Sequence, residues 1–149
     1  RGYIMQVITR IGLSEANHVL DAAQRQAEAI GVPQNIVVVD ESGHLVAARR
    51  MDGAKFIALD IAINKALTAA GSRKATRDLA PAVLPGQPAF GIHAQAGGRF
   101  TTLAGGIPLV VEGVVVGAVG VSSGSTDEDQ EVAEAGARAF AERFATHAG

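Results

Sequence analysis

The sequence predicts a single-domain α+β sandwich in which a central antiparallel sheet of about five strands is flanked by helices. Two hairpin patterns and three helical patterns lead to this prediction. In the clearer hairpin, β-branched runs end at Val111 and begin again at Val114, on either side of Glu112-Gly113. Glycine allows the positive φ that such a short turn needs. With 149 residues the chain has the size of one ordinary domain, so we expect one domain over residues 1–149.

The first helix is expected to begin near Ser14, a plausible N-cap. Its apolar residues recur at the three-four spacing of an amphipathic helix. Gly31 and Pro33 end it. Residues 35–40 and 44–49 then predict two strands, joined by a loop whose Gly43 takes the left-handed conformation.

Two more helices follow. One is expected over residues 56–70. The last begins at Ser125, which forms a capping box with Glu128, and runs to about Phe144. Between them, residues 71–99 contain three prolines, several glycines and a basic cluster. Because long irregular segments in compact domains are often functional, we expect a pocket rim or lid there.

Composition excludes several classes of protein. A net charge of -2 leaves no basic excess for a nucleic acid partner, and the apolar runs are too short to span a membrane. The absence of cysteine excludes disulfides, a thiolate nucleophile and thiolate-ligated haem or zinc. The N-terminus lacks the pattern of a secretion signal, so we expect a cytoplasmic location, although a processed precursor would leave the same sequence. Residues 1–4 are expected to come from a cloning vector.

The second hairpin strand contains glycines where side chains are normally found, at Gly117 and Gly120. A strand glycine leaves bare backbone for a packed helix, a neighbouring subunit or a flat ligand to approach. Together with Gly105 and Gly106, Gly120 is therefore a candidate for ligand contact, with helix packing as the alternative.

Lys65 is the clearest anomaly of the second helix, because it falls on the apolar side, whereas Asp60 lies on a polar stripe with Asn64 and Thr68. Either the lysine stem crosses apolar surface to water or to a neighbouring carboxylate, or its cation faces a pocket and holds an acidic ligand. Arg50, at a strand end, is a candidate for the same ligand or a solvated residue.

Histidine is the best iron ligand in a chain without cysteine. His93 lies on the expected pocket rim and His18 on the polar side of the first helix, which makes both candidates for an axial haem ligand. His44 is expected at the surface, and His147 is expected in the C-terminal tail. The spacing of the four matches no zinc motif, so we expect no metal site of the bare protein.

Four segments together resemble the GlcG/HbpS-like family, which includes the C-terminal domain of PduO-type proteins. These are residues 36–45, 50–54, 60–69 and 103–127. The resemblance implies a profilin-like or GlcG-like sandwich that forms homo-oligomers and binds haem or a corrinoid. It also implies a lysine at the position of Lys65 and a first-helix histidine proposed for haem.

We therefore expect a domain that binds haem or a related tetrapyrrole, with corrinoid as the alternative cofactor. The pocket is expected between the second helix, residues 85–99 and the glycine-rich hairpin, with Lys65 and Arg99 contacting the acidic groups. One alternative is a small-molecule enzyme with Lys65 as base or clamp and Asp60 or His93 as proton carrier. Another is an oligomeric regulatory or assembly module without catalysis.

Overall fold

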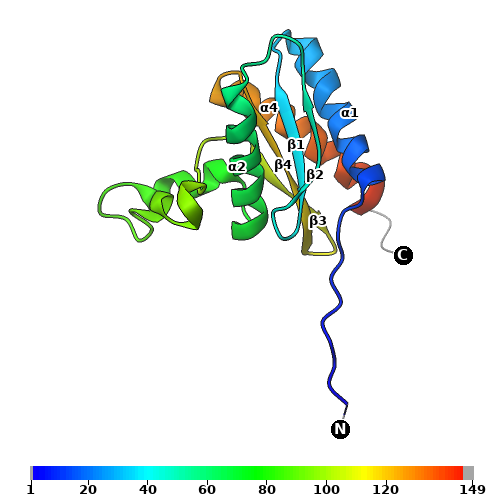
Figure 1. Cartoon of the computed structure of the whole chain (residues 1–149), viewed down its shortest axis with the longest axis vertical. Coiled ribbons are helices and arrows are strands. Elements are labelled where there is room, and N and C mark those ends of the chain that lie inside the picture. Colours follow the sequence, from blue (N-terminus) through cyan, green and yellow to red (C-terminus); the bar gives the residue numbers. More distant parts are fainter. Residues whose placement is uncertain (1, 146–149) are drawn as a thin grey trace.

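The computed structural model describes residues 2–145, so His147 lies outside the described residues. A four-stranded antiparallel sheet has the order β2-β1-β4-β3. Helices α1 and α4 cover one face of this sheet, and α2 covers the other (Figure 1). The elements are α1 (Leu13–Ile30), β1 (Asn35–Asp40), β2 (Leu45–Arg50), α2 (Ile57–Ser72), α3 (Thr76–Leu79), β3 (Gly106–Val111), β4 (Val114–Ser122) and α4 (Thr126–Phe140).

The α+β class is confirmed, but the sheet has four strands rather than about five. The two hairpins supply all four. No strand forms in residues 80–98, which contain three short 3₁₀ turns, Ala80–Val83, Ile92–Ala94 and Ala96–Gly98. Prolines interrupt this segment, and its glycines 86, 91, 97 and 98 have positive φ. The N-terminal segment before α1 is extended. It is attached to β4 by the Ile11 amide, which donates to the Val116 carbonyl at 3.0 Å.

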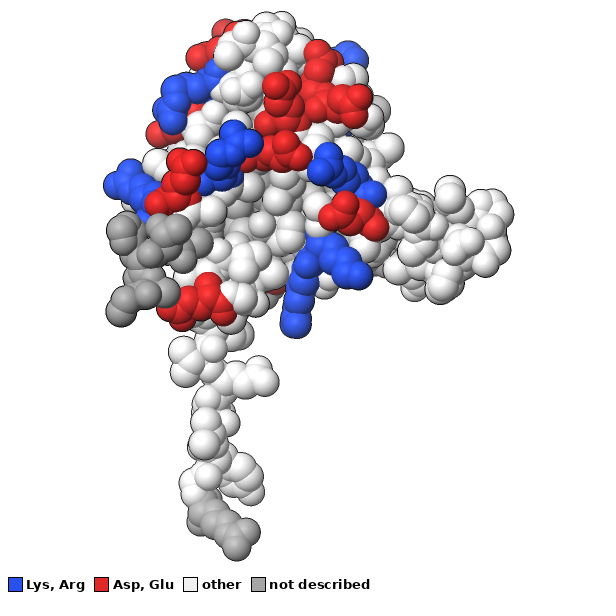
Figure 2. Space-filling model, turned by 180° about the vertical axis from the view of Figure 1, so that it is seen from behind, with Lys and Arg blue, Asp and Glu red and all other residues white. Residues whose placement is uncertain are grey.

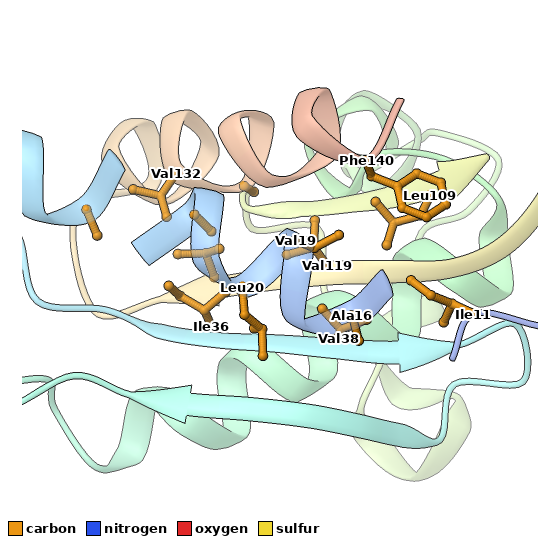
Figure 3. Packing of buried hydrophobic residues seen from close by; sticks show 14 of the residues in the cluster. Ile11, Ala16, Val19, Leu20, Ile36, Val38, Leu109, Val119, Val132 and Phe140 are labelled. Carbon is orange, nitrogen blue, oxygen red and sulfur yellow. The ribbon is translucent and has the colours of Figure 1, made fainter. Parts of the chain in front are cut away.

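The larger core lies between the sheet and helices α1 and α4. Alternation along β1 directs Ile36 and Val38 into this core and Val37 and Val39 toward α2. Val19 and Leu20 of α1 meet them from the helix side, as Figure 3 shows. The layer against α2 consists mainly of alanine and valine, which lets this helix lie close to the sheet.

The first and last long helices, α1 and α4, begin with different N-terminal caps. α1 begins at Leu13 with Gly12 as N-cap, so the expected Ser14 cap is wrong. The Glu15 carboxylate accepts from the Gly12 amide at 3.1 Å instead. The predicted capping box of α4 is confirmed: the Glu128 amide donates to Ser125 Oγ at 3.2 Å, and the Glu128 carboxylate accepts from the Ser125 amide at 2.8 Å. These bonds lower the pKa of Glu128.

Gly120 is the point of closest approach between α2 and the sheet. A Cβ at this position would overlap the Ala62 carbonyl oxygen and come within 2.7 Å of the Ala66 amide nitrogen. Because these atoms belong to helix backbone, no side chain can move away to make room. In this structure helix packing accounts for the glycine.

We expect Gly120→Ala to lower the free energy of unfolding by about 3 kcal/mol or more, because overpacking here forces α2 away from β4. Gly71→Ala is the matched control: Gly71 lies in α2 and has open space around its Cα. Replacing it should stabilise the fold by about 0.5–1 kcal/mol through helix propensity. Urea unfolding of both variants measures the difference, and equal effects would contradict the packing role of Gly120.

An ion pair between Arg10 and Glu41 holds the N-terminal segment against the first hairpin. Arg10 Nε donates to Glu41 Oε2 at 2.9 Å. This hydrogen bond lowers the pKa of Glu41 from its ordinary 4.5 to about 2. A carboxyl whose pKa is lower in the folded state stabilises the fold above its ordinary pKa and loses that contribution as the pH falls through its folded value.

The attachment of this segment should therefore weaken between pH 4.5 and 2. Hydrogen exchange at the Ile11 amide, corrected for the intrinsic pH dependence of exchange, should show falling protection over this range. In Arg10→Gln the protection should be lower at neutral pH and lose the part of its pH dependence that comes from Glu41. Identical pH profiles for the two proteins would show that the ion pair does not hold the segment.

Candidate functional site

A cavity of about 490 Å³ opens between the outer side of α2 and the irregular segment that follows it. We call residues 79–98 of this segment the flap. The cavity walls are mainly apolar, and Arg99 is the charged residue among the described lining residues. They are Leu67, Thr68, Gly71 and Ser72 of α2, Leu79, Ile92 and Ala96 of the flap, and Arg99 and Phe100.

Two buried threonines attach the chain that returns from the flap. Thr68 Oγ1 donates to the Arg99 carbonyl at 3.4 Å and accepts from the Thr101 amide at 3.1 Å. Thr76 Oγ1 donates to the Leu103 carbonyl at 2.6 Å and accepts from the Gly106 amide at 3.0 Å. These bonds fix the wall that carries Arg99 and Phe100. Thr68 was visible in the sequence only as part of a polar stripe, which gave no signal that it holds another segment.

His93 flanks the cavity. It follows Ile92 and packs edge to face on Phe100, with ring centroids 6.4 Å apart. Its Nε2 lies 3.4 Å from Thr102 Oγ1. His93 is an exposed residue.

His18 lies elsewhere, on α1 against the C-terminal end of α4. Its Nε2 donates to the Ala139 carbonyl at 3.2 Å, and its Nδ1 accepts from Arg143 at 3.3 Å. Both nitrogens thus have protein partners. Because α1 and α2 cover opposite faces of the sheet, the two histidines do not converge on one ligand in the cavity.

Lys65 is 1% exposed, and its Nζ lies 2.8 Å from Asp129 Oδ2 and donates to the Val121 carbonyl at 2.8 Å. Burial lowers the pKa of Lys65, while the hydrogen bond and the charge of Asp129 oppose that shift. Of the two expectations for this residue, the pairing with a neighbouring carboxylate is present. Asp129 is one of three acidic residues in the first turn of α4, where carboxylates stabilise the helix dipole, and no local pattern shows that its side chain turns inward.

Gly105 and Gly106 pass beside this ion pair. A Cβ on Gly105 would lie 3.0 Å from Asp129 Cβ and 3.1 Å from Lys65 Nζ. A Cβ on Gly106 would overlap the Lys65 carbonyl. Their bare backbone therefore meets protein atoms here, and a ligand contact at either glycine stays a prediction.

The other two candidate residues lie apart from the cavity. Asp60 is exposed on α2, five residues from Lys65, and the structure does not bring the two side chains together. Arg50 is exposed at the end of β2 and lines a hollow of about 520 Å³. Because charged and polar residues of α1 and β2 surround that hollow, it suits an apolar ligand less well than the α2 cavity.

Within residues 2–145 no group of three or more potential ligands could hold a bare metal ion. In the same range no helix is both long and apolar enough to cross a membrane.

Breaking the Lys65–Asp129 pair should cost stability, because the remaining partner is left buried and unpaired. We expect Lys65→Met to lower the free energy of unfolding by about 3–5 kcal/mol. Asp129→Asn, which keeps a side-chain acceptor for the Gly124 amide, should also destabilise. The double variant should lose clearly less than the sum of the two. Additive losses in a denaturant double-mutant cycle would show that the two charges do not interact.

The fold is that of a small α+β domain, with a largely apolar cavity on the outer side of the helix that covers one face of the sheet. A family model described as haem degrading protein HbpS-like matches residues 11–138. The chain therefore belongs to the HbpS-like family, as the resemblance predicted.

Curated relatives support the assignment. The chain is 36% identical over 137 residues to an uncharacterized 15.0 kDa protein from the dhaT-dhaS intergenic region of Citrobacter freundii, covering 92% of this chain and 96% of that protein. It is 39% identical over 116 residues to protein GlcG of Escherichia coli K12, covering 76% and 84%. The corrinoid adenosyltransferase PduO of Citrobacter freundii is 34% identical over 124 residues, but these are 83% of this chain and only 37% of PduO.

Solved structures show the same fold. Klebsiella pneumoniae protein ORFY superimposes with a TM-score of 0.91 at 32% identity, over 95% of this chain and 97% of that one. A PduOC:heme complex gives a TM-score of 0.84 at 28% identity, over 88% and 95%. HbpS gives 0.81 at 31%, over 93% and 95%.

Proposed function

We propose that this protein binds haem in the cavity between α2 and the flap. The observation that carries the proposal is the chemistry of the cavity wall: an apolar surface with one cation, Arg99, and a histidine, His93, at its side. The porphyrin plane is apolar, its propionates are anionic, and its iron takes imidazole as a ligand. A cavity of about 490 Å³ falls within the range of small-molecule sites.

The residues present fit the parts of haem. Arg99 would hold a propionate, since guanidinium pairs with carboxylate in two hydrogen bonds. His93 would hold the iron. When bound, haem would supply the redox chemistry of that iron. Apolar side chains of Leu67, Ile92 and Phe100 would exclude water from the porphyrin faces. A corrinoid fits less well, because its rim carries amides and this wall offers few hydrogen-bonding groups.

The comparisons support the proposal at the level of the family. One solved relative is a haem complex, and the matching family model names haem degradation. The enzyme alternative centred on Lys65 gains no such support, because Lys65 has two protein partners and does not line the α2 cavity.

An absorbance titration with hemin tests the proposal, with cobalamin as the control ligand. We expect a saturable Soret shift at one hemin per chain or per dimer, and none of comparable strength with cobalamin. His93→Ala should change the Soret position, and Arg99→Ala should weaken binding by about tenfold, as expected for loss of one charge-assisted contact.

His18→Ala is the control for His93→Ala, because His18 lies on the other face of the sheet. It should leave the hemin spectrum unchanged. A broad spectrum that does not saturate, or one that responds to His18→Ala and not to His93→Ala, would overturn the assignment of this cavity.

A further inference from the structure

Another cavity, of about 430 Å³, lies at the end of the molecule where α2 finishes. Its walls are residues 6–9 of the N-terminal segment, the β1–β2 turn, the end of α2 and the β3–β4 turn. Figure 1 shows these parts together at the lower end of the fold, so we call this space the lower cavity. It shares no described lining residue with the α2 cavity.

Two charged residues, Glu41 and Arg73, are among the described lining residues of the lower cavity. The Glu41 carboxylate is already engaged, because it accepts from Arg10 Nε at 2.9 Å and from Ser42 Oγ at 3.0 Å. Arg73 differs, since no hydrogen bond or ion pair within residues 2–145 engages its guanidinium group. The cavity therefore contains one cation that no carboxylate of the described chain neutralises.

The backbone of Arg73 has an unusual conformation. Arg73 is the C-terminal cap of α2, with φ 61° and ψ 28° in the left-handed region. Glycine is the usual residue there, because a Cβ in this conformation comes close to the following carbonyl oxygen. A cation near the carbonyl end of a helix complements the helix dipole, but the neighbouring Lys74 can do so without lining the cavity. Strained backbone that places a free charged group in a cavity is typical of a binding site.

The rest of the lower cavity offers uncharged and partly apolar surface. Residues 6–9 contain no charged side chain, and the N-terminal segment extends from the body as a row of uncharged side chains when seen from behind (Figure 2). Val7 of this segment and Val114 at the start of β4 line the cavity, yet they are 96% and 54% exposed. Covering them with a bound molecule removes apolar surface from water.

We propose that the lower cavity binds a small organic carboxylate, whose anionic group pairs with Arg73 and whose apolar body packs against Val7 and Val114. A guanidinium group holds a carboxylate through two hydrogen bonds, and Glu41 does not repel it because Arg10 neutralises Glu41. The cavity volume is near the small end of the range for small-molecule sites. The proposal does not rest on haem binding, because Arg73 lies outside the described lining of the α2 cavity.

NMR titration of the full-length, ¹⁵N-labelled chain with 4-fluorobenzoate tests the proposal. We expect saturable shifts of the Arg73 side-chain Nε signal and of the Ala70 and Val115 amides, which line the same cavity. The uncharged 4-fluorobenzamide should bind at least about tenfold more weakly, because it lacks the charge-assisted contact. Inorganic phosphate, which has the charge but no apolar body, should also bind at least about tenfold more weakly.

Matched variants assign the contact to Arg73. Arg73→Gln should raise the dissociation constant of 4-fluorobenzoate by at least about tenfold. Lys74→Gln removes the neighbouring cation and should leave that constant unchanged. Arg73→Gly should also lose binding, while its urea midpoint should rise because the left-handed backbone no longer carries a Cβ. A purely structural arginine would not separate binding from stability in this way.

A second pair of variants tests the apolar wall. Val114→Asp should abolish binding, because it places a carboxylate beside the bound anion. Val110→Asp adds the same charge to the same hairpin at a residue that is 38% exposed and outside the cavity lining, so it should bind normally. Circular dichroism of each variant separates loss of binding from unfolding.

Three results would overturn the proposal. One is equal affinity for 4-fluorobenzoate, its amide and phosphate. Another is an affinity that is unchanged in Arg73→Gln or falls equally in Lys74→Gln. The third is the absence of a saturable shift of the Arg73 side chain with 4-fluorobenzoate, isovalerate and hexanoate up to about 50 mM, a concentration above any useful dissociation constant.

Discussion

The close approach of α2 to strand β4 is the constraint on which the rest of the structure depends. The helix backbone at Ala62 and Ala66 occupies the space that a side chain of Gly120 would fill. Small residues line the facing side of α2, so helix and sheet meet backbone to backbone. This contact fixes the height and rotation of α2. The contact thereby determines which side chains of α2 face inward, toward the β3 end of the sheet, and which face outward into the cavity.

This placement of α2 buries the charged end of Lys65, which therefore needs partners inside the protein. Taking an ammonium group and a carboxylate out of water costs several kcal/mol each, and the pair is tolerated only with good geometry and further hydrogen bonds. Asp129 and the Val121 carbonyl provide these for the ammonium group, and the Gly124 amide provides one for the carboxylate. Because Gly105 and Gly106 have no side chains, the two charges meet beside the beginning of β3. The pair therefore links α2 with α4, which cover opposite faces of the sheet.

The cavity follows from the unequal covering of the two faces. Two helices pack on one face, while α2 lies alone on the other. Its outer side would be exposed without the chain that Thr68 and Thr76 attach to it. That chain covers α2 only in part, which leaves an apolar hollow between helix and flap. The same irregular segment thus forms one wall of the cavity.

The sequence by itself determined the type and approximate position of the longer elements, but neither the number of strands nor the short helix α3. Periodicity located α1, β1, β2, α2 and α4 within a few residues, the Glu112-Gly113 turn identified the second hairpin, and the capping box located the start of α4. These signals are local, because each depends on neighbours a few residues apart. The resemblance in four segments identified the family, and the prolines and glycines of residues 71–99 marked the irregular wall of the pocket.

Only the tertiary structure decided which side chains meet. The partner of Lys65 lies 64 residues away on another helix. No local pattern distinguishes the inward Asp129 from its acidic neighbours Asp127 and Glu128, which stabilise the helix dipole. The same holds for Gly120, whose neighbour proved to be a helix backbone, and for His18 and His93, which the fold separates onto opposite faces. Long-range pairing depends on the angle and distance at which helices pack on the sheet. Those quantities are set by the summed fit of many side chains rather than by any one segment.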